Sequence, residues 1–194
     1  MGNRQGRERA IGRRGLSAKG AGFALAVAAM ALAVRADDRP PQVQAHIALA
    51  TDAVHAGSQV KMVVVAEIPA GFHINDHKPT LEYLIPTEVK VTAASPLSVK
   101  GVFYPRGEPR KFTFEDTPLS VYAGSVVIGA LLEVPSSAAP GEYGLQGKIS
   151  YQACNDQACF PPSSVPVTLK VKVVGEKVRL KPVNQDVFRR ASFK

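Results

Sequence analysis

The sequence predicts an all-β protein, a single β-sandwich domain that follows an N-terminal export signal. After residue 42 the chain consists of short apolar or alternating runs, and prolines, glycines, Asn and Asp separate these runs. Turn signals spaced about every eight to twelve residues are typical of sandwiches and barrels. No segment after residue 37 keeps the 3.6-residue period of an amphipathic helix, so we expect no helical domain.

Nine segments are candidate strands by composition and length. They are 43–50, 59–68, 71–75, 81–85, 88–93, 98–104, 119–134, 143–153 and 164–174. Val60, Met62 and Val64 recur with a period of two, and so do the apolar residues of 167–173, as in half-buried strands. The long run 119–134 should bend at Gly124 or Gly129, because glycine inside a strand marks a bend or bulge.

Residues 1–36 have the composition of a secretory signal peptide. Six basic side chains and one acid in 1–20 precede the uncharged, alanine-rich residues 21–34. That apolar stretch is shorter than the roughly 20 residues needed to cross a bilayer. Small residues at 34 and 36 favour cleavage before Asp37, so we expect a periplasmic protein. Arg13-Arg14 matches the twin-arginine signal only weakly, which favours the general Sec route.

The formal net charge of +8 belongs mainly to the two ends of the chain. The predicted signal peptide carries seven basic residues and one acid, which leaves 17 basic and 15 acidic residues in 37–194. This balance argues against a nucleic-acid partner. We expect a flexible N-terminus at 37–42, the folded domain at 43–174 and a basic tail at 175–194. The tail is interpreted as a solvated extension, with weak contact to anionic lipid as the alternative.

Cys154 and Cys159 are the only cysteines, and they flank the polar turn sequence Asn155-Asp156-Gln157. Two cysteines that flank a turn can approach closely enough for a disulfide, and export to an oxidising compartment favours that bond. Closing so short a loop contributes only roughly 2 kcal/mol in the chain-entropy model. From spacing alone three interpretations stay open: a structural hairpin bridge in a binding or adaptor module, a redox pair, and a metal-binding pair.

The metal interpretation would add His73 and His77 to the two cysteines as zinc ligands. Residues four apart on a strand are about 13 Å distant, so both histidines could reach one ion only if the chain turned sharply at Asn75-Asp76. The sequence contains neither the C-x-x-C motif of thioredoxins nor a haem-attachment motif. We therefore expect no bound cofactor and no metal.

Three segments together resemble the N-terminal (alpha) domain of the DsbD thiol:disulfide interchange proteins, over roughly residues 40 to 174. The third segment is the most specific, because Tyr-Gln-x-Cys close to Cys-x-Pro-Pro is not a general strand pattern. The segments are Gly71–Asn75 with Tyr83–Thr87, then Phe112–Asp116 with Pro118–Tyr122, and finally Tyr151–Cys154 with Cys159–Pro162.

The resemblance implies an immunoglobulin-like sandwich in the bacterial periplasm whose cysteine pair transfers electrons. Such a domain, part of a protein-disulfide reductase, accepts electrons from a membrane electron transporter through a thioredoxin-like module. It passes them to periplasmic thioredoxin-like proteins, including those of cytochrome c maturation. By this resemblance Cys159 forms the mixed disulfide with partners and Cys154 resolves it. Because the sequence ends soon after the predicted sandwich, we expect a stand-alone domain that receives electrons from a separate protein.

The resemblance also implies a cap loop, 111–118, that covers the cysteine pair until a partner displaces it. Phe114 is the first candidate for the shielding ring and Phe112 the second; the alternative is that both are core residues. Glu115 and Asp116 beside a cysteine would raise the thiol pKa and keep the free protein unreactive. If they lie away from the cysteines, they form a solvated turn.

His73 and Asn75 lie two residues apart and therefore on one face of a strand. By the resemblance this face lies near the sulfur atoms, at positions where some relatives carry tyrosines. A hydrogen-bonded structural role for His73 is favoured over a proton-carrying role.

Overall fold

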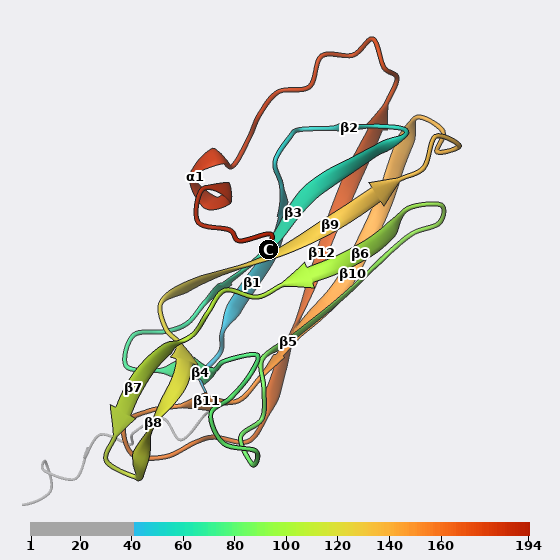
Figure 1. Cartoon of the computed structure of the whole chain (residues 1–194). Coiled ribbons are helices and arrows are strands. Elements are labelled where there is room, and N and C mark those ends of the chain that lie inside the picture. The colour runs from blue at the N-terminus through green and yellow to red at the C-terminus, as the bar shows by residue number, and fades with distance from the viewer. Residues whose placement is uncertain (1–40) are drawn as a thin grey trace, which may run out of the picture. The chain divides into compact units, whose positions relative to one another are not determined.

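The computed structural model describes residues 41–194, and these residues form an almost entirely β structure (Figure 1). The predicted signal peptide and most of the predicted flexible N-terminus lie outside the described residues. Val43, immediately after them, is buried, and its amide donates a hydrogen bond to the Tyr151 hydroxyl.

Two four-stranded sheets form the body of the domain. The order in the first sheet is β1 (Gln44–Leu49), β3 (Ser58–Glu67), β9 (Ser125–Val134) and β6 (Ser98–Phe103), and every pair in it is antiparallel. The order in the second sheet is β2 (Val54–His55), β12 (Ser163–Val174), β10 (Gly141–Tyr151) and β5 (Glu88–Ala93). In this sheet only the short β2 is parallel to its neighbour.

The core lies between these two sheets. Met62, Val64 and Ile128 from the first sheet pack in one cluster with Leu145 and Val171 from the second. Burying such side chains contributes about 1.5–3 kcal/mol each before the entropic cost of folding is subtracted. The structure confirms the predicted all-β, immunoglobulin-like sandwich, since two mainly antiparallel sheets pack face to face around alternating apolar residues.

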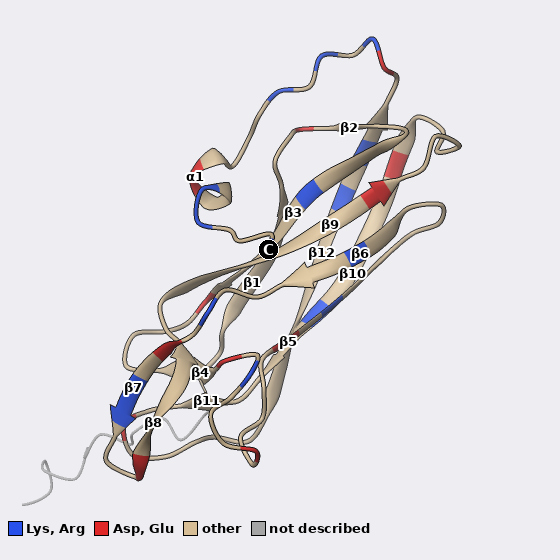
Figure 2. Ribbon diagram, viewed as in Figure 1, with Lys and Arg blue, Asp and Glu red and all other residues tan. Residues whose placement is uncertain are grey.

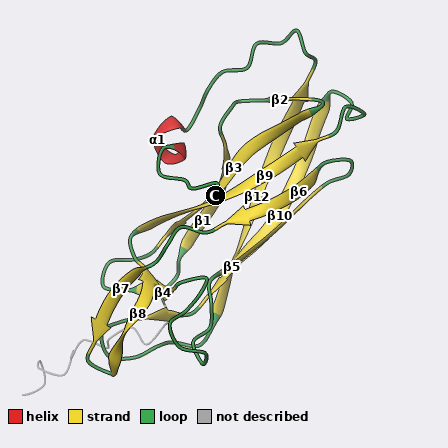
Figure 3. Ribbon diagram, viewed as in Figure 1, coloured by secondary structure: helices red, strands yellow, loops and turns green. Residues whose placement is uncertain are grey.

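A third, smaller sheet lies at one end of the sandwich and includes the first cysteine (Figures 1 and 3). Its order is β11 (Ala153–Cys154), β4 (His73–Asn75), β8 (Glu115–Tyr122) and β7 (Glu108–Phe112). β11 follows β10 directly in the chain, while β7 and β8 form a hairpin whose turn is Thr113-Phe114. A strand of the main core therefore leads directly to the cysteine region.

Most of the predicted strands are present, with three corrections. Residues 81–85 form turns instead of a strand, since Pro79 and Pro86 flank them and the Leu84 amide bonds to the Leu81 carbonyl. The run 119–134 is divided between β8 and β9 by Gly124, whose φ of +63° favours glycine. The other predicted bend residue, Gly129, lies within β9. The sequence analysis missed β2 and β7; four of the five β7 residues are exposed, so β7 lacks an apolar pattern.

The basic tail was expected to be a solvated extension, and the structure contradicts this. Residues 181–184 bond to the end of β1, and the segment that follows includes α1 (Gln185–Phe188), the only helix among residues 41–194. Phe188 and Phe193 pack on Val63 and Val65, which face away from the main core. The six lysines and arginines of residues 175–194 are exposed, and Figure 2 marks their positions along the ribbon. No helix in the described residues is long and apolar enough to span a membrane.

Candidate functional site: a covered cysteine pair at the end of the sandwich

Cys154 and Cys159 are joined in a disulfide at the end of the sandwich where β10 continues into β11. Their Cα atoms are 3.9 Å apart. The Asn155 side-chain oxygen shapes the turn between them by accepting hydrogen bonds from the amides of Gln157 and Ala158, both at 2.9 Å. Asn favours such turns because its side chain can replace a backbone acceptor.

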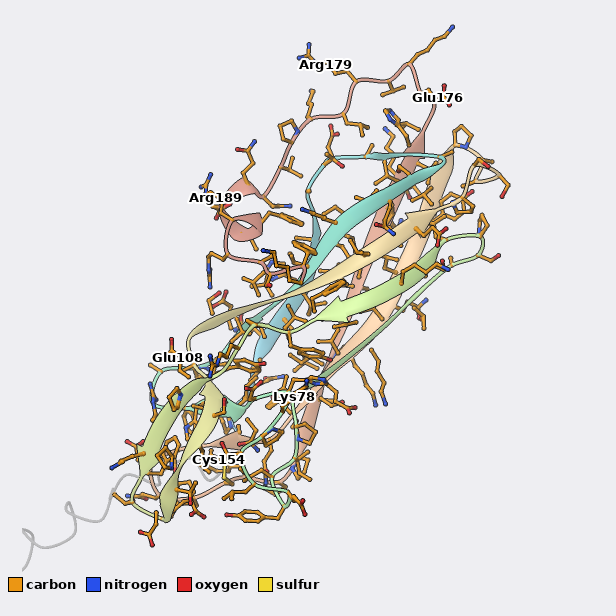
Figure 4. The ribbon with its side chains drawn as sticks, in the orientation of Figure 1. Lys78, Glu108, Cys154, Glu176, Arg179 and Arg189 are labelled. Atoms are coloured by element: carbon orange, nitrogen blue, oxygen red, sulfur yellow. A yellow bond between two sulfur atoms is a disulfide. The ribbon has the colours of Figure 1, made fainter. Side chains whose placement is uncertain are left out.

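The two sulfur-bearing residues differ in exposure. Cys154 is completely buried, whereas Cys159 is partly exposed and lines a surface pocket of about 260 Å³. Figure 4 shows Cys154 at the end of the sandwich that carries the β7–β8 hairpin, far from Arg189 in the tail. An attacking thiolate from outside therefore reaches Cys159 first. The pocket is lined by Tyr83, Leu84, Phe114, Gln152, Gln157, Ala158 and Cys159.

Aromatic rings from the β7–β8 hairpin cover this region. The His73 ring, on the strand beside Cys154, stacks on Phe112 with ring centroids 4.1 Å apart. Phe112 in turn stacks on Phe114, at 5.3 Å. Phe112 is buried in a small cluster with Leu84 and other residues, while Phe114 is exposed at the pocket. We call residues 111–118, the tip of this hairpin, the cap.

Two hydrogen bonds connect the cap to its surroundings. The Thr113 hydroxyl donates to the Asp156 carbonyl at 2.7 Å, which attaches the cap to the turn between the cysteines. The Tyr83 hydroxyl donates to the Glu115 carboxylate at 2.7 Å. Both bonds are exposed, so each is weak enough to break when a partner arrives.

A buried carboxylate holds the base of the same hairpin. Asp76 follows β4 and accepts hydrogen bonds from the hydroxyls of Tyr122 and Ser120, at 2.5 and 2.7 Å, and from the Gly107 amide. Burial alone would raise the Asp76 pKa, but these hydrogen bonds outweigh it and hold the pKa below its usual value. A side chain at Gly107 would collide with Asp76 and Ser120, so only glycine fits there. The base of the hairpin is therefore firmly fixed, in contrast to its tip.

Two buried polar atoms on β4, the strand beside Cys154, have no hydrogen-bond partner within residues 41–194. In the described residues only two buried side-chain polar atoms lack a hydrogen-bond partner, and these are Nε2 of His73 and Oδ1 of Asn75. Burial, assisted by the positive charge of Arg110 and opposed by Asp156, lowers the pKa of His73 to about 4. The imidazole is therefore neutral at neutral pH.

Asn75 connects β4 to the segment after the second cysteine. Its side-chain amide donates to the Ile85 carbonyl and to the Gln152 side-chain oxygen, at 2.9 and 3.2 Å. Gln152 donates onward to the Phe160 carbonyl. Sequence analysis assigned no role to Gln152, Tyr83, Thr113 or Asp76, although the first three lie in segments that carry the family resemblance.

The structure brings the predicted site residues together to different degrees. His73 is paired in register with Cys154, and Asn75 lies on the same strand. Glu115 bonds to Tyr83, which lowers the pKa of its carboxyl group, and Asp116 is exposed. The favoured hydrogen-bonded role of His73 is not seen at Nε2.

The four-ligand metal set is not assembled. His77 stacks on Tyr104 and contacts the Thr87 carbonyl through Nδ1, while the two cysteines bind each other. Within residues 41–194 no group of three or more His, Cys, Asp or Glu side chains could hold an ion.

The fold and the site define a class: an immunoglobulin-like sandwich with one disulfide at its end, beneath an aromatic hairpin. The sequence profile described as "Thiol:disulfide interchange protein DsbD, N-terminal" matches residues 39–170. The chain belongs to this family. A search of curated protein sequences gave no match.

Solved structures with a related arrangement show low sequence identity. The reduced DsbD N-terminal domain of Neisseria meningitidis is 17% identical, with a TM-score of 0.36 over 60% of this chain and 82% of that one. The N-terminal periplasmic domain of ScsB from Proteus mirabilis is also 17% identical, with a TM-score of 0.44 over 71% of this chain and 49% of that one. A complex of the DsbD and PilB N-terminal domains of Neisseria meningitidis gives 18% identity and a TM-score of 0.38, over 67% of this chain and 85% of the matched one.

Proposed function

We propose that this chain is a periplasmic thiol:disulfide exchange domain that uses Cys154 and Cys159 to pass electrons between a membrane-linked reductant and thioredoxin-like proteins. The observation that carries the proposal is the asymmetry of the pair: Cys159 lines an open pocket and Cys154 is fully buried. Membership of a thiol:disulfide interchange family supports it. A disulfide needed only for stability would have no use for a pocket at one of its sulfurs.

The proposed reaction has two halves. A thiolate of the donor attacks Cys159 Sγ, the bond to Cys154 breaks, and Cys154 leaves as a thiolate that takes up a proton. The second thiolate of the donor then displaces Cys159, which leaves this domain reduced and the donor oxidised. In the second half the Cys159 thiolate attacks the acceptor disulfide, and Cys154 attacks Cys159 Sγ to release the acceptor as a dithiol.

The surface around the pocket supports a protein partner. Among the described residues the large apolar side chains that are clearly exposed include Tyr83 at 68%, Ile85 at 40% and Phe114 at 39%. Tyr83 and Phe114 line the Cys159 pocket, and the Ile85 amide bonds to Gln152, which also lines it. An apolar patch around a reactive sulfur suits the surface around the C-x-x-C motif of a thioredoxin-like protein.

The cap would give this exchange its selectivity. Phe114 and the Thr113–Asp156 bond restrict access to Cys159, while a partner that buries the exposed apolar side chains can displace them. Access rather than redox potential alone would then decide which thiols react.

The test is a trapping experiment with two variants of the full chain exported to the periplasm of a Gram-negative host. Cys154→Ala leaves Cys159 free and should accumulate mixed disulfides, visible on non-reducing gels, with proteins that mass spectrometry identifies as carrying C-x-x-C. The matched Cys159→Ala variant should accumulate few or none, since Cys154 is buried. Equal trapping by both variants, or by neither, would refute the assigned roles.

The reduction potential separates this proposal from a binding module with a structural bridge. Structural disulfides typically lie below about −300 mV, whereas exchange proteins lie between about −270 and −120 mV. We expect the Cys154–Cys159 pair in the second range when it is equilibrated with glutathione or dithiothreitol. A value below −300 mV would favour the adaptor function.

A further inference from the structure

We propose that His73 is the proton acceptor for Cys154 when Cys154 resolves a mixed disulfide. This inference rests on the proposed exchange function and adds a group to its site. Three independent observations lead to it: the register of β4 on β11, the unpartnered ring nitrogen, and the position of the imidazole under the cap.

The register places the two side chains together. His73 is directly opposite Cys154 in the antiparallel β4–β11 pair. Side chains of directly opposed residues project from the same face of a sheet, with Cβ atoms about 4.5–5.5 Å apart. An imidazole at that separation can reach the sulfur of its cross-strand neighbour.

The unpartnered Nε2 atom allows His73 to accept a proton. His73 is only 1% exposed, and its Nε2 is one of two buried side-chain nitrogen or oxygen atoms in residues 41–194 without a hydrogen-bond partner. In the Nδ1–H tautomer, Nε2 carries a free lone pair and can only accept. Leaving such a group unpaired costs free energy, so it calls for an explanation. In the disulfide form Cys154 has no proton to give, and in the reduced form its S–H is a donor.

The surroundings keep the ring neutral and in place. Stacking on Phe112 fixes the imidazole plane. Arg110 on β7 disfavours the imidazolium form and Asp156 in the cysteine turn favours it, and burial outweighs both. A thiolate beside the ring would favour the imidazolium strongly, because an opposite charge at short range stabilises a charged group.

The resolving step moves one proton and exchanges one S–S bond for another. In the mixed disulfide, Cys154 is a buried thiol, and burial without a base holds it in the unreactive protonated form. Its proton moves to Nε2 of His73, and the thiolate attacks Cys159 Sγ. The bond between Cys159 and the partner sulfur breaks, and the partner leaves as a thiolate with the electron pair. In the reverse direction the same imidazolium returns the proton to Cys154 as it leaves.

The experiment follows the reduced full-length protein after rapid mixing with excess 5,5′-dithiobis(2-nitrobenzoate). Attack by Cys159 releases one thionitrobenzoate, and attack by Cys154 on the resulting mixed disulfide releases a second. The rate of this second release is independent of reagent concentration and reports the resolving step. In the wild type it should vary little between pH 6 and 8, because His73 accepts the proton throughout this range.

His73→Phe keeps a ring against Phe112 and removes the nitrogen. We expect the second release to slow by about a hundredfold at pH 7, the low end of general-base effects. It should also rise about tenfold per pH unit, because solvent must then remove the proton to generate the thiolate. His73→Gln should show the same slow, pH-dependent second release, since an amide is no base. This variant replaces His73→Phe in the experiment if His73→Phe fails to fold. The control is His46→Gln, at an exposed histidine on β1.

The outcomes separate the two proposals. A normal first release and a slow, pH-dependent second release in the His73 variants, with an unchanged melting temperature, support His73 as the acceptor. An unchanged second release with a wild-type pH profile overturns this inference and leaves the exchange function standing. Absence of any second release in the wild type overturns the exchange function itself.

Discussion

Phe114 provides the sharpest test of the cap, and the change we consider is Phe114→Ala. The ring stacks on Phe112 at a centroid distance of 5.3 Å and an interplanar angle of 17°, and it lines the Cys159 pocket. A stacked aromatic pair contributes about 0.5–1.5 kcal/mol beyond the area it buries. If opening the cap breaks this stack, the loss of the stack raises the open fraction by about 2- to 12-fold, since 1.4 kcal/mol is a factor of ten.

The assay is the rate at which dithiothreitol reduces the disulfide at pH 7, followed by alkylation with a maleimide that shifts the protein on a gel. Phe114→Ala should be reduced about 2- to 12-fold faster than the wild type, because more frequent opening of the cap widens the approach of a small thiol to the partly exposed Cys159. Val178→Ala is the matched control: this side chain is 49% exposed and lies in the tail. It should be reduced at the wild-type rate.

The result that would refute the reasoning is a Phe114→Ala protein reduced at the wild-type rate or more slowly. A second possibility must be distinguished, which is faster reduction through general loosening of the fold. Because Phe114 is 39% exposed and outside the main core, its loss should lower the free energy of unfolding far less than the about 3–5 kcal/mol typical of a buried Phe→Ala change. Thermal unfolding of both variants measures this.

Three further changes test the parts around the cap. Asp76→Asn should lower the free energy of unfolding at pH 7 by about 1–3 kcal/mol in urea titrations. It should also remove part of the acid sensitivity: a carboxyl with a lowered folded-state pKa stabilises the fold above its unfolded value of 3.8, and this is lost as pH falls through the folded value. Gly129→Ala should free the tail for trypsin, since its Cβ would lie 2.5 Å from the Ser192 carbonyl; wild-type cleavage rates would contradict this. Thr113→Val removes the bond to Asp156 and should speed amide hydrogen exchange at the hairpin tip, whereas unchanged exchange would show that this bond does not hold the cap.

The strands of the sandwich were predictable because their signal is local. Alternation in 60–64 and 167–173 reflects one buried and one outward face, and the structure puts Met62, Val64 and Val171 in the main core. Val63 and Val65 are buried as well, which alternation does not explain. The reason is the tail: Phe188 and Phe193 cover that face from more than 120 residues away, and no local pattern in 176–194 reveals a partner so distant in sequence.

The distinction between local patterns and contacts distant in sequence also holds at the site. The spacing of Cys154 and Cys159 around a turn sequence allowed a disulfide to be expected, and the structure contains it. The contacts that surround it join segments far apart in the chain, such as Thr113 to Asp156 and Asn75 to Gln152. Composition could not identify these contacts, because each depends on how three separate segments meet at one end of the sandwich.

The exceptions to the usual rules of folding gather at that end. Natural sequences mostly satisfy buried polar groups and cover apolar ones, and departures concentrate where function requires them. Within residues 41–194, both buried side-chain polar atoms without a hydrogen-bond partner, on His73 and Asn75, lie on β4 beside β11, the strand that ends in Cys154. The most exposed of the large apolar side chains in the described chain, Tyr83, lines the pocket at Cys159. A hairpin whose disulfide served only stability would gain nothing from an unpartnered buried polar atom or from an exposed apolar side chain. A sulfur pair that exchanges with partners gains a base for its buried thiol and an apolar contact for its exposed one.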